Sequence, residues 1–176
     1  MTTMTTERRL AELSRRIEAL DGSARSGDEL TPRMQRHLEA LRRHEARARA
    51  VIGETPEEID GTLVQLEMRL DVAEHSQTAD AADDRSTFTS AVDQELDSWD
   101  AYLERLQTSA ATGAGRARPQ AEAGIGELRT RRLEVERRLA ELRSGSPDAG
   151  SELETRVTAA RERLEQAADQ LTETLS

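Results

Sequence analysis

Apolar residues recur along this chain at alternating spacings of three and four, the period that places side chains on one face of an α-helix. The first series is Leu10, Leu13, Ile17 and Leu20. A second series starts at Met34, directly after Thr31-Pro32. Threonine caps free N–H groups at a helix start and proline fits the first turn, so this dipeptide predicts where the second helix begins. A Gly/Ser-rich loop separates the two series, and residues 6–52 are therefore expected to form a helical hairpin.

The middle of the chain carries a third apolar series that loses its phase halfway. It follows Thr55-Pro56-Glu57-Glu58, which has the pattern of a capping box with a proline start. The polar residues 76–87 interrupt the series, and the pattern resumes out of register at Phe88. These polar residues either break one helix into two or form an exposed stretch of a continuous helix. We therefore expect a long helix or a helix pair over residues 56–107.

The last third of the chain repeats the pattern of a linker followed by a helical hairpin. Residues 108–119 are rich in Ala, Gly and Thr and are expected to be the linker. Two further apolar series, separated near Gly145, predict the hairpin over residues 120–175. No alternating strand pattern occurs. The sequence predicts a single all-α domain over residues 1–176, an elongated antiparallel helical bundle or coiled coil of five or six helices.

One heptapeptide, Glu-Arg-Arg-Leu-Ala-Glu-Leu, occurs twice, at residues 7–13 and 136–142. Each copy lies in one of the expected hairpins. Duplication of a structural unit would produce such a repeat. Chance would also produce it in a chain rich in these residue types, and the flanking residues match poorly.

Composition supports narrow seams between helices rather than a broad core. Charged residues make up 34% of the chain and aromatic residues only 2%, and cysteine is absent. Disulfides and cysteine-ligated metals are therefore excluded. The first residues carry no apolar run typical of a signal peptide, and no window approaches the roughly 18 apolar residues that cross a bilayer. These features predict a cytoplasmic protein.

Charge is distributed unevenly along the chain. Residues 1–52 hold 11 Arg against 8 acidic residues, residues 53–115 hold 3 against 15, and residues 116–176 hold 11 against 12. The acidic middle either packs between the Arg-rich hairpins or binds a basic partner. We expect residues 56–107 to dock against the hairpins, because acids within single helical turns repel one another unless arginine lies nearby.

These patterns favour a non-enzymatic coiled-coil scaffold or adaptor that acts through helix–helix contacts, with a protein partner or by self-association. Candidate interaction residues are Trp99 and Tyr102, since both types are enriched in interfaces, and Arg42, Arg43 and Arg47 on the second helix. Core packing is the alternative for the two aromatic residues. The net charge of -10 disfavours nucleic-acid binding. The last helix lacks an aromatic anchor, which disfavours binding to a membrane surface.

A helical-bundle metal protein or enzyme is the alternative function. It would use His37 and His44, which lie seven residues apart on one helical face, or acidic residues of the middle segment. Di-iron bundles use Glu-x-x-His pairs, and no glutamate lies three residues before any histidine here. Asp71 and His75 form a single pair one helical turn apart. The sequence therefore predicts no cofactor, no metal ligands and no catalytic residues.

Overall fold

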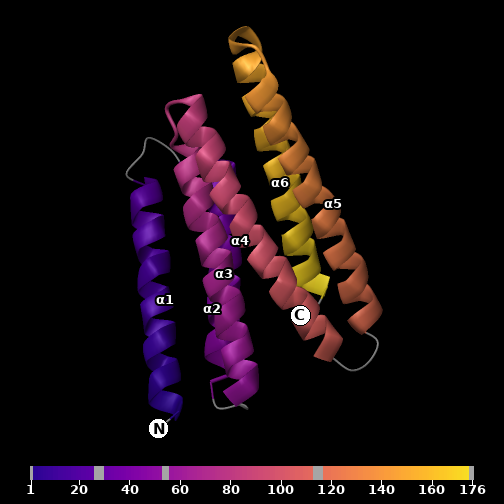
Figure 1. The fold of residues 1–176 in the computed structure, drawn as a ribbon. Helices are drawn as coiled ribbons and strands as arrows, with labels where there is room; N and C mark the ends of the chain where they lie inside the picture. Colours follow the sequence, from indigo (N-terminus) through magenta and orange to yellow (C-terminus); the bar gives the residue numbers. More distant parts are fainter. Residues whose placement is uncertain (1, 26–29, 53–55, 113–116, 175–176) are drawn as a thin grey trace. The chain divides into compact units, whose positions relative to one another are not determined.

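The computed structural model of the chain describes residues 2–25, 30–52, 56–112 and 117–174. In these residues the fold consists of six α-helices and one short 3-10 turn, and no strand occurs (Figure 1). The expected all-α class is thus confirmed, and the described residues form six of the expected five or six helices. Within the described ranges, no helix combines the length and the apolar character that crossing a membrane requires.

The chain divides into two compact units of three helices each. The N-terminal unit, Met1–Ala81, contains α1 (Thr2–Arg25), α2 (Pro32–Ala50) and α3 (Pro56–Asp80). The C-terminal unit, Ala82–Ser176, contains α4 (Arg85–Thr112), α5 (Ala117–Ser144) and α6 (Gly150–Thr174), with the 3-10 turn Pro147–Ala149 leading into α6.

The acidic middle of the chain is a pair of helices. Helix α3 ends at Asp80 and α4 begins at Arg85, so the polar stretch does break the segment. Asp84 caps the new helix, because its carboxylate accepts hydrogen bonds from the Thr87 backbone N–H (2.9 Å) and hydroxyl (2.7 Å). The backbone hydrogen bond, followed by the one from the hydroxyl, lowers the pKa of Asp84.

Other helix ends follow the sequence signals only in part. Thr31 accepts a hydrogen bond from the Met34 backbone N–H at 3.2 Å, which confirms the expected cap of α2. The cap expected at Thr55 lies outside the described residues. The expected linker 108–119 is shorter than its composition indicates, since α4 runs to Thr112 and α5 starts at Ala117. Alanine is the strongest helix former, so Ala-rich ends prolong both helices.

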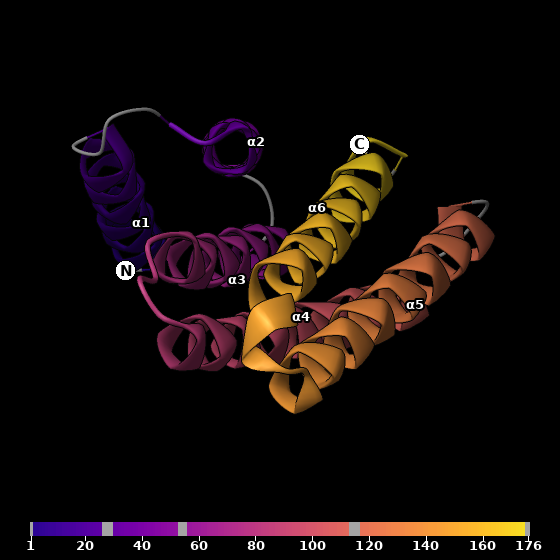
Figure 2. The same ribbon diagram turned by 90° about the horizontal axis from the view of Figure 1, so that it is seen from above.

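The N-terminal unit is held together by an apolar cluster to which all three of its helices contribute. Figure 2 shows α1, α2 and α3 at the corners of a triangle when the unit is seen from above. The cluster consists of Leu10, Leu13, Ile17, Leu20, Met34, Leu38, Leu41, Ala48, Ile59, Leu63, Leu66, Leu70 and Ala73. These are largely the residues of the three apolar series, so the periodicity correctly predicts the buried face of each helix.

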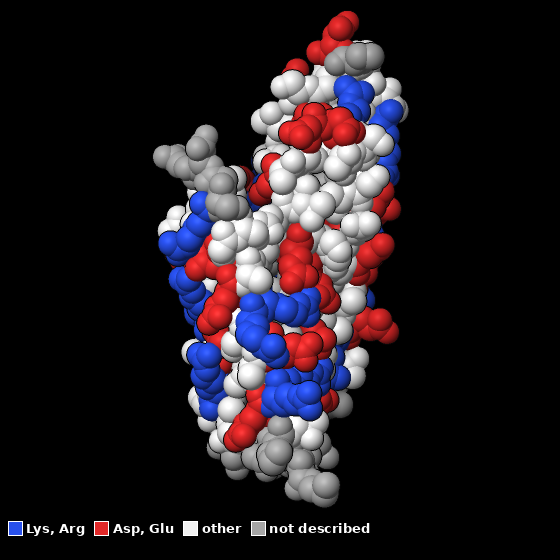
Figure 3. Space-filling model, turned by 90° about the vertical axis from the view of Figure 1, so that its left-hand side faces the viewer, with Lys and Arg blue, Asp and Glu red and all other residues white. Residues whose placement is uncertain are grey.

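Arginines of α1 reach across this unit to the acids of α3. Arg9 contacts Asp60 at 2.8 Å and Glu67 at 2.6 Å. Two helical turns further on, Arg16 contacts Asp71 at 2.7 Å and Glu74 at 2.8 Å. Figure 3 shows one face of the molecule on which arginine and acidic side chains lie side by side. These contacts support the expectation that the acidic middle pairs with Arg-rich helices.

The C-terminal unit repeats this pairing and buries one pair. Arg132 of α5 contacts Asp100 of α4 at 2.7 Å. Arg161 of α6 contacts Glu95 of α4 through Nε at 2.7 Å and Nη2 at 2.6 Å, and the two side chains are 1% and 2% exposed. The Arg161 guanidinium also lies 5.8 Å from the centre of the Phe88 ring.

Reversing the charge of the two α1 arginines that contact α3, Arg9→Glu with Arg16→Glu, is expected to destabilise the N-terminal unit. Each substitution replaces an attraction to two α3 carboxylates by a repulsion. Both arginine side chains are about one-third exposed. After solvent screening we expect a loss of about 1–2 kcal/mol in the free energy of unfolding, measured by denaturation followed by circular dichroism.

The matched control is Arg8→Glu with Arg15→Glu, which makes the same charge change at the same spacing on the same helix. Both side chains are exposed, and neither contacts a carboxylate among the described residues. An equal loss of stability in the two double variants would show that the contacts from α1 to α3 contribute nothing specific.

Candidate interaction surface

The two aromatic residues expected at an interface lie in the interior. Trp99 is 0% exposed and Tyr102 is 2% exposed. Their ring centres lie 5.9 Å apart in an edge-to-face arrangement, with planes at 75°. This is a favoured geometry for an aromatic pair in a core. Both residues thus pack in the core, which is the alternative that the sequence left open for them.

The three arginines expected at the surface are exposed on α2. Arg42 contacts Asp21 of α1 at 2.7 Å, and Asp21 also accepts a hydrogen bond from Arg25 at 2.6 Å. The contact with Arg25, followed by that with Arg42, lowers the pKa of Asp21. Arg43 and Arg47 lie on the same helix. The arginines that contact acids of α3 include Arg9 and Arg16 of α1 and another arginine of α2, Arg33, which contacts Asp80 at 2.8 Å.

The candidate metal ligands His37 and His44 are both buried, at 2% and 4% exposure. Burial, followed by the positive charges of Arg69, Arg47 and Arg43, lowers the pKa of His44 to about 3. An environment that repels a proton also repels a metal cation. Among the described residues, no group of three or more His, Cys, Asp or Glu side chains is placed to hold a metal ion.

A groove lies between α4 and α5, and the apolar pattern of the sequence does not predict it. Its larger part, about 610 Å³, is lined by Asp100, Leu103, Glu104, Gln107, Arg129, Arg132 and Leu133. Its smaller part, about 270 Å³, is lined by Gln107, Ala110, Ala111, Glu122, Ile125, Gly126 and Arg129. Gln107 and Arg129 line both parts, which therefore form one continuous α4–α5 groove. It follows about three turns of each helix, roughly 17 Å.

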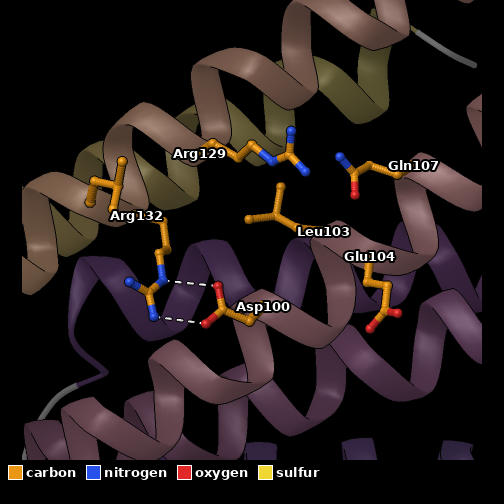
Figure 4. Close-up of a pocket in the computed structure, with 7 residues that line it drawn as sticks. Asp100, Leu103, Glu104, Gln107, Arg129 and Arg132 are labelled. Atoms are coloured by element: carbon orange, nitrogen blue, oxygen red, sulfur yellow. Dashed lines mark hydrogen bonds and ion pairs between the residues drawn. The ribbon is translucent and has the colours of Figure 1, made fainter.

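Opposite charges line the two sides of the groove (Figure 4). At one end, the Arg132 guanidinium contacts the Asp100 carboxylate through two hydrogen bonds of 2.9 and 2.7 Å. Further along, Glu104 on α4 and Arg129 on α5 are exposed, and neither forms an ion pair with a described residue. Leu103 lies between the two sides. The groove therefore offers one uncompensated carboxylate and one uncompensated guanidinium.

An exposed leucine completes the groove. Leu133 is 60% exposed and is the one large apolar side chain at the surface of the described part of the chain. The space beside Gly126 is open, since a Cβ atom there would meet no atom within 4 Å. Leu133 lies five residues after Leu128 and two before Val135, off the apolar seam of its helix. That irregular position is the sequence signal that could have identified this surface.

Substituting His44 by Gln is expected to reduce the acid sensitivity of folding. The pKa of His44 is about 3 in the folded chain against an ordinary 6.5. Below about pH 6.5 the unfolded chain binds a proton at this position that the folded chain does not. As the pH is lowered below about 6.5, the free energy of unfolding therefore decreases, by up to about 1.4 kcal/mol per pH unit from this group.

Urea unfolding of the wild type and His44→Gln between about pH 7 and pH 5 measures this slope. His75→Gln is the control, because the His75 side chain is partly exposed. Equal slopes for the wild type and His44→Gln would contradict the prediction.

Comparison with known proteins yields no relative, since no family model, no curated protein and no solved structure matches this chain. The role of the α4–α5 groove must therefore be inferred from its own residues.

Proposed function

We propose that this protein is a non-enzymatic scaffold or adaptor that acts through helix–helix contacts, and that the α4–α5 groove is its binding surface. The observation that carries the proposal is the combination in one groove of the exposed Leu133 with the uncompensated charges of Glu104 and Arg129. A cytoplasmic location, as expected from the sequence, is part of the proposal.

The shape of the groove suits a helical partner. A helix that lies in a groove between two helices contributes apolar residues one and two turns apart. The floor of this groove is apolar at Leu103 and Ile125, and its sides are polar or charged. Protein interfaces commonly have this arrangement of an apolar centre and a polar rim. Leu133 is the side chain with the most apolar surface to bury when a partner binds.

The chemistry of the other charged residues supports binding over catalysis. The acids that face neighbouring helices are held by arginine, as with Asp71 and Glu74 at Arg16. These carboxylates are engaged in contacts between helices. His37 and His44 acquire no third ligand from the described residues. No observation therefore favours the metal-binding or enzymatic alternative.

Leu133→Glu is expected to abolish partner binding while leaving the fold intact. Loss of a large apolar contact at an interface costs about 2 kcal/mol, which is roughly thirtyfold in affinity. The measurement is quantitative affinity capture with the full chain, which compares the proteins enriched by the wild type and by the variant.

Ala123→Glu is the matched control, because it places the same charge at an exposed position of α5 that does not line the groove. The proposal requires partners that are retained by the Ala123 variant and lost by the Leu133 variant. Equal retention by both variants would show that the groove is not the binding surface.

A further inference from the structure

The two uncompensated charges lie on opposite sides of the groove at about the same level, because Arg132 contacts Asp100 and each charge lies about one helical turn further along the groove from that contact. Glu104 belongs to α4 and Arg129 to α5, and both line the larger part of the groove. Helices α4 and α5 are consecutive and lie side by side as an antiparallel pair (Figure 1). One side of the groove is thus negative at the point where the other side is positive.

This arrangement is complementary to itself under one particular symmetry. A two-fold axis that runs along the groove places the α4 side of one copy over the α5 side of the other. Glu104 of each copy then meets Arg129 of its partner, and the contact occurs twice. A two-fold axis across the groove would instead place Glu104 over Glu104 and Arg129 over Arg129, which is repulsive.

We propose that a second copy of this chain occupies the α4–α5 groove, related by a two-fold axis along the groove. The inference rests on the proposed use of the groove for binding and identifies the partner. Helices α4 and α5 of the two copies form a four-helix arrangement in which each α4 lies against the α5 of the other copy. Leu133 of each copy becomes covered by the partner.

The distribution of charge favours a second copy over a different protein. A basic or an acidic partner would be attracted to one side of the groove and repelled by the other. A second copy satisfies both sides at once. The contact covers about three turns of two helices on each copy, which is less than the roughly 1,200 Å² typical of stable complexes. The dimer is therefore weak and forms at micromolar or higher concentrations.

The test is sedimentation velocity on the full chain over a concentration series from about 1 to 500 µM. The wild type is expected to show a reversible monomer–dimer equilibrium. Glu104→Arg and Arg129→Glu should each weaken self-association by about tenfold or more, because each change turns two attractive contacts into two repulsive ones. Circular dichroism and the melting temperature should stay unchanged, since both side chains are exposed and lack an ion-pair partner in the described residues.

Mixing the two single variants provides the decisive arm. In the mixed dimer, Arg at position 104 of one chain meets Glu at position 129 of the other, and the native Arg129 and Glu104 meet at the second contact. The mixture should therefore dimerise more strongly than either variant alone. The chain with both Glu104→Arg and Arg129→Glu should also dimerise with itself, but not with the wild type.

A wild type that stays monomeric over the whole series would overturn the inference. So would a dimer that neither reversal weakens, or variants whose association is not restored by mixing. If the chain is monomeric and Leu133→Glu still loses a captured protein, the groove binds a different partner. In that case this inference fails while the proposed function stands. If the Leu133→Glu variant keeps both the dimer and the captured protein, then this inference and the proposed function both fail.

Discussion

The C-terminal unit depends on one ion pair that is almost fully removed from water, between Arg161 of α6 and Glu95 of α4. Transferring a charged side chain into a protein interior costs several kcal/mol, and only a close, hydrogen-bonded partner of opposite charge offsets that cost. Any shift of α6 along α4 would leave both charges buried and unpaired. The pair therefore fixes the register of the two helices. A pair of apolar residues could provide similar stability, but it would tolerate sliding.

The same constraint operates throughout the chain in weaker, more exposed form. The acidic middle is divided between the two units, and each half is paired with arginines of its own unit: α3 with Arg9 and Arg16, and α4 with Arg132 and Arg161. Arginine suits this task because its planar group can contact two carboxylates or one carboxylate twice. Once these contacts are made, Glu104 and Arg129 remain without ion-pair partners in the described chain, and they face the groove. The charges that folding leaves unpaired in this groove are thus available for recognition.

Much of the fold could be predicted from the sequence, because apolar periodicity identifies the buried side of a helix without reference to its neighbours. The repeated heptapeptide shows where this approach stops. Its leucines are buried in both copies, at Leu10 and Leu13 as at Leu139 and Leu142. Its third residue behaves differently: Arg9 reaches α3, whereas Arg138 contacts Glu141 on its own helix at 2.9 Å. Identical letters thus acquire different contacts from different neighbours. The α4–α5 groove could not be predicted for the same reason, since it depends on how far two helices separate, and Leu133 was the only irregularity in the pattern that marked it.

A double-mutant cycle on the buried pair tests most directly the claim that charge pairing between helices sets their arrangement. The variants are Glu95→Gln, Arg161→Met and the combination of both. Trp99 is the only tryptophan of the chain, is fully buried and belongs to the C-terminal unit, so its fluorescence reports the unfolding of that unit in urea. Each single variant should lose about 3–5 kcal/mol, because it leaves one buried charge unpaired. The combination should lose much less than the sum, with a coupling of about 2 kcal/mol or more. Additive losses would mean that the two side chains do not depend on each other, and would contradict the account.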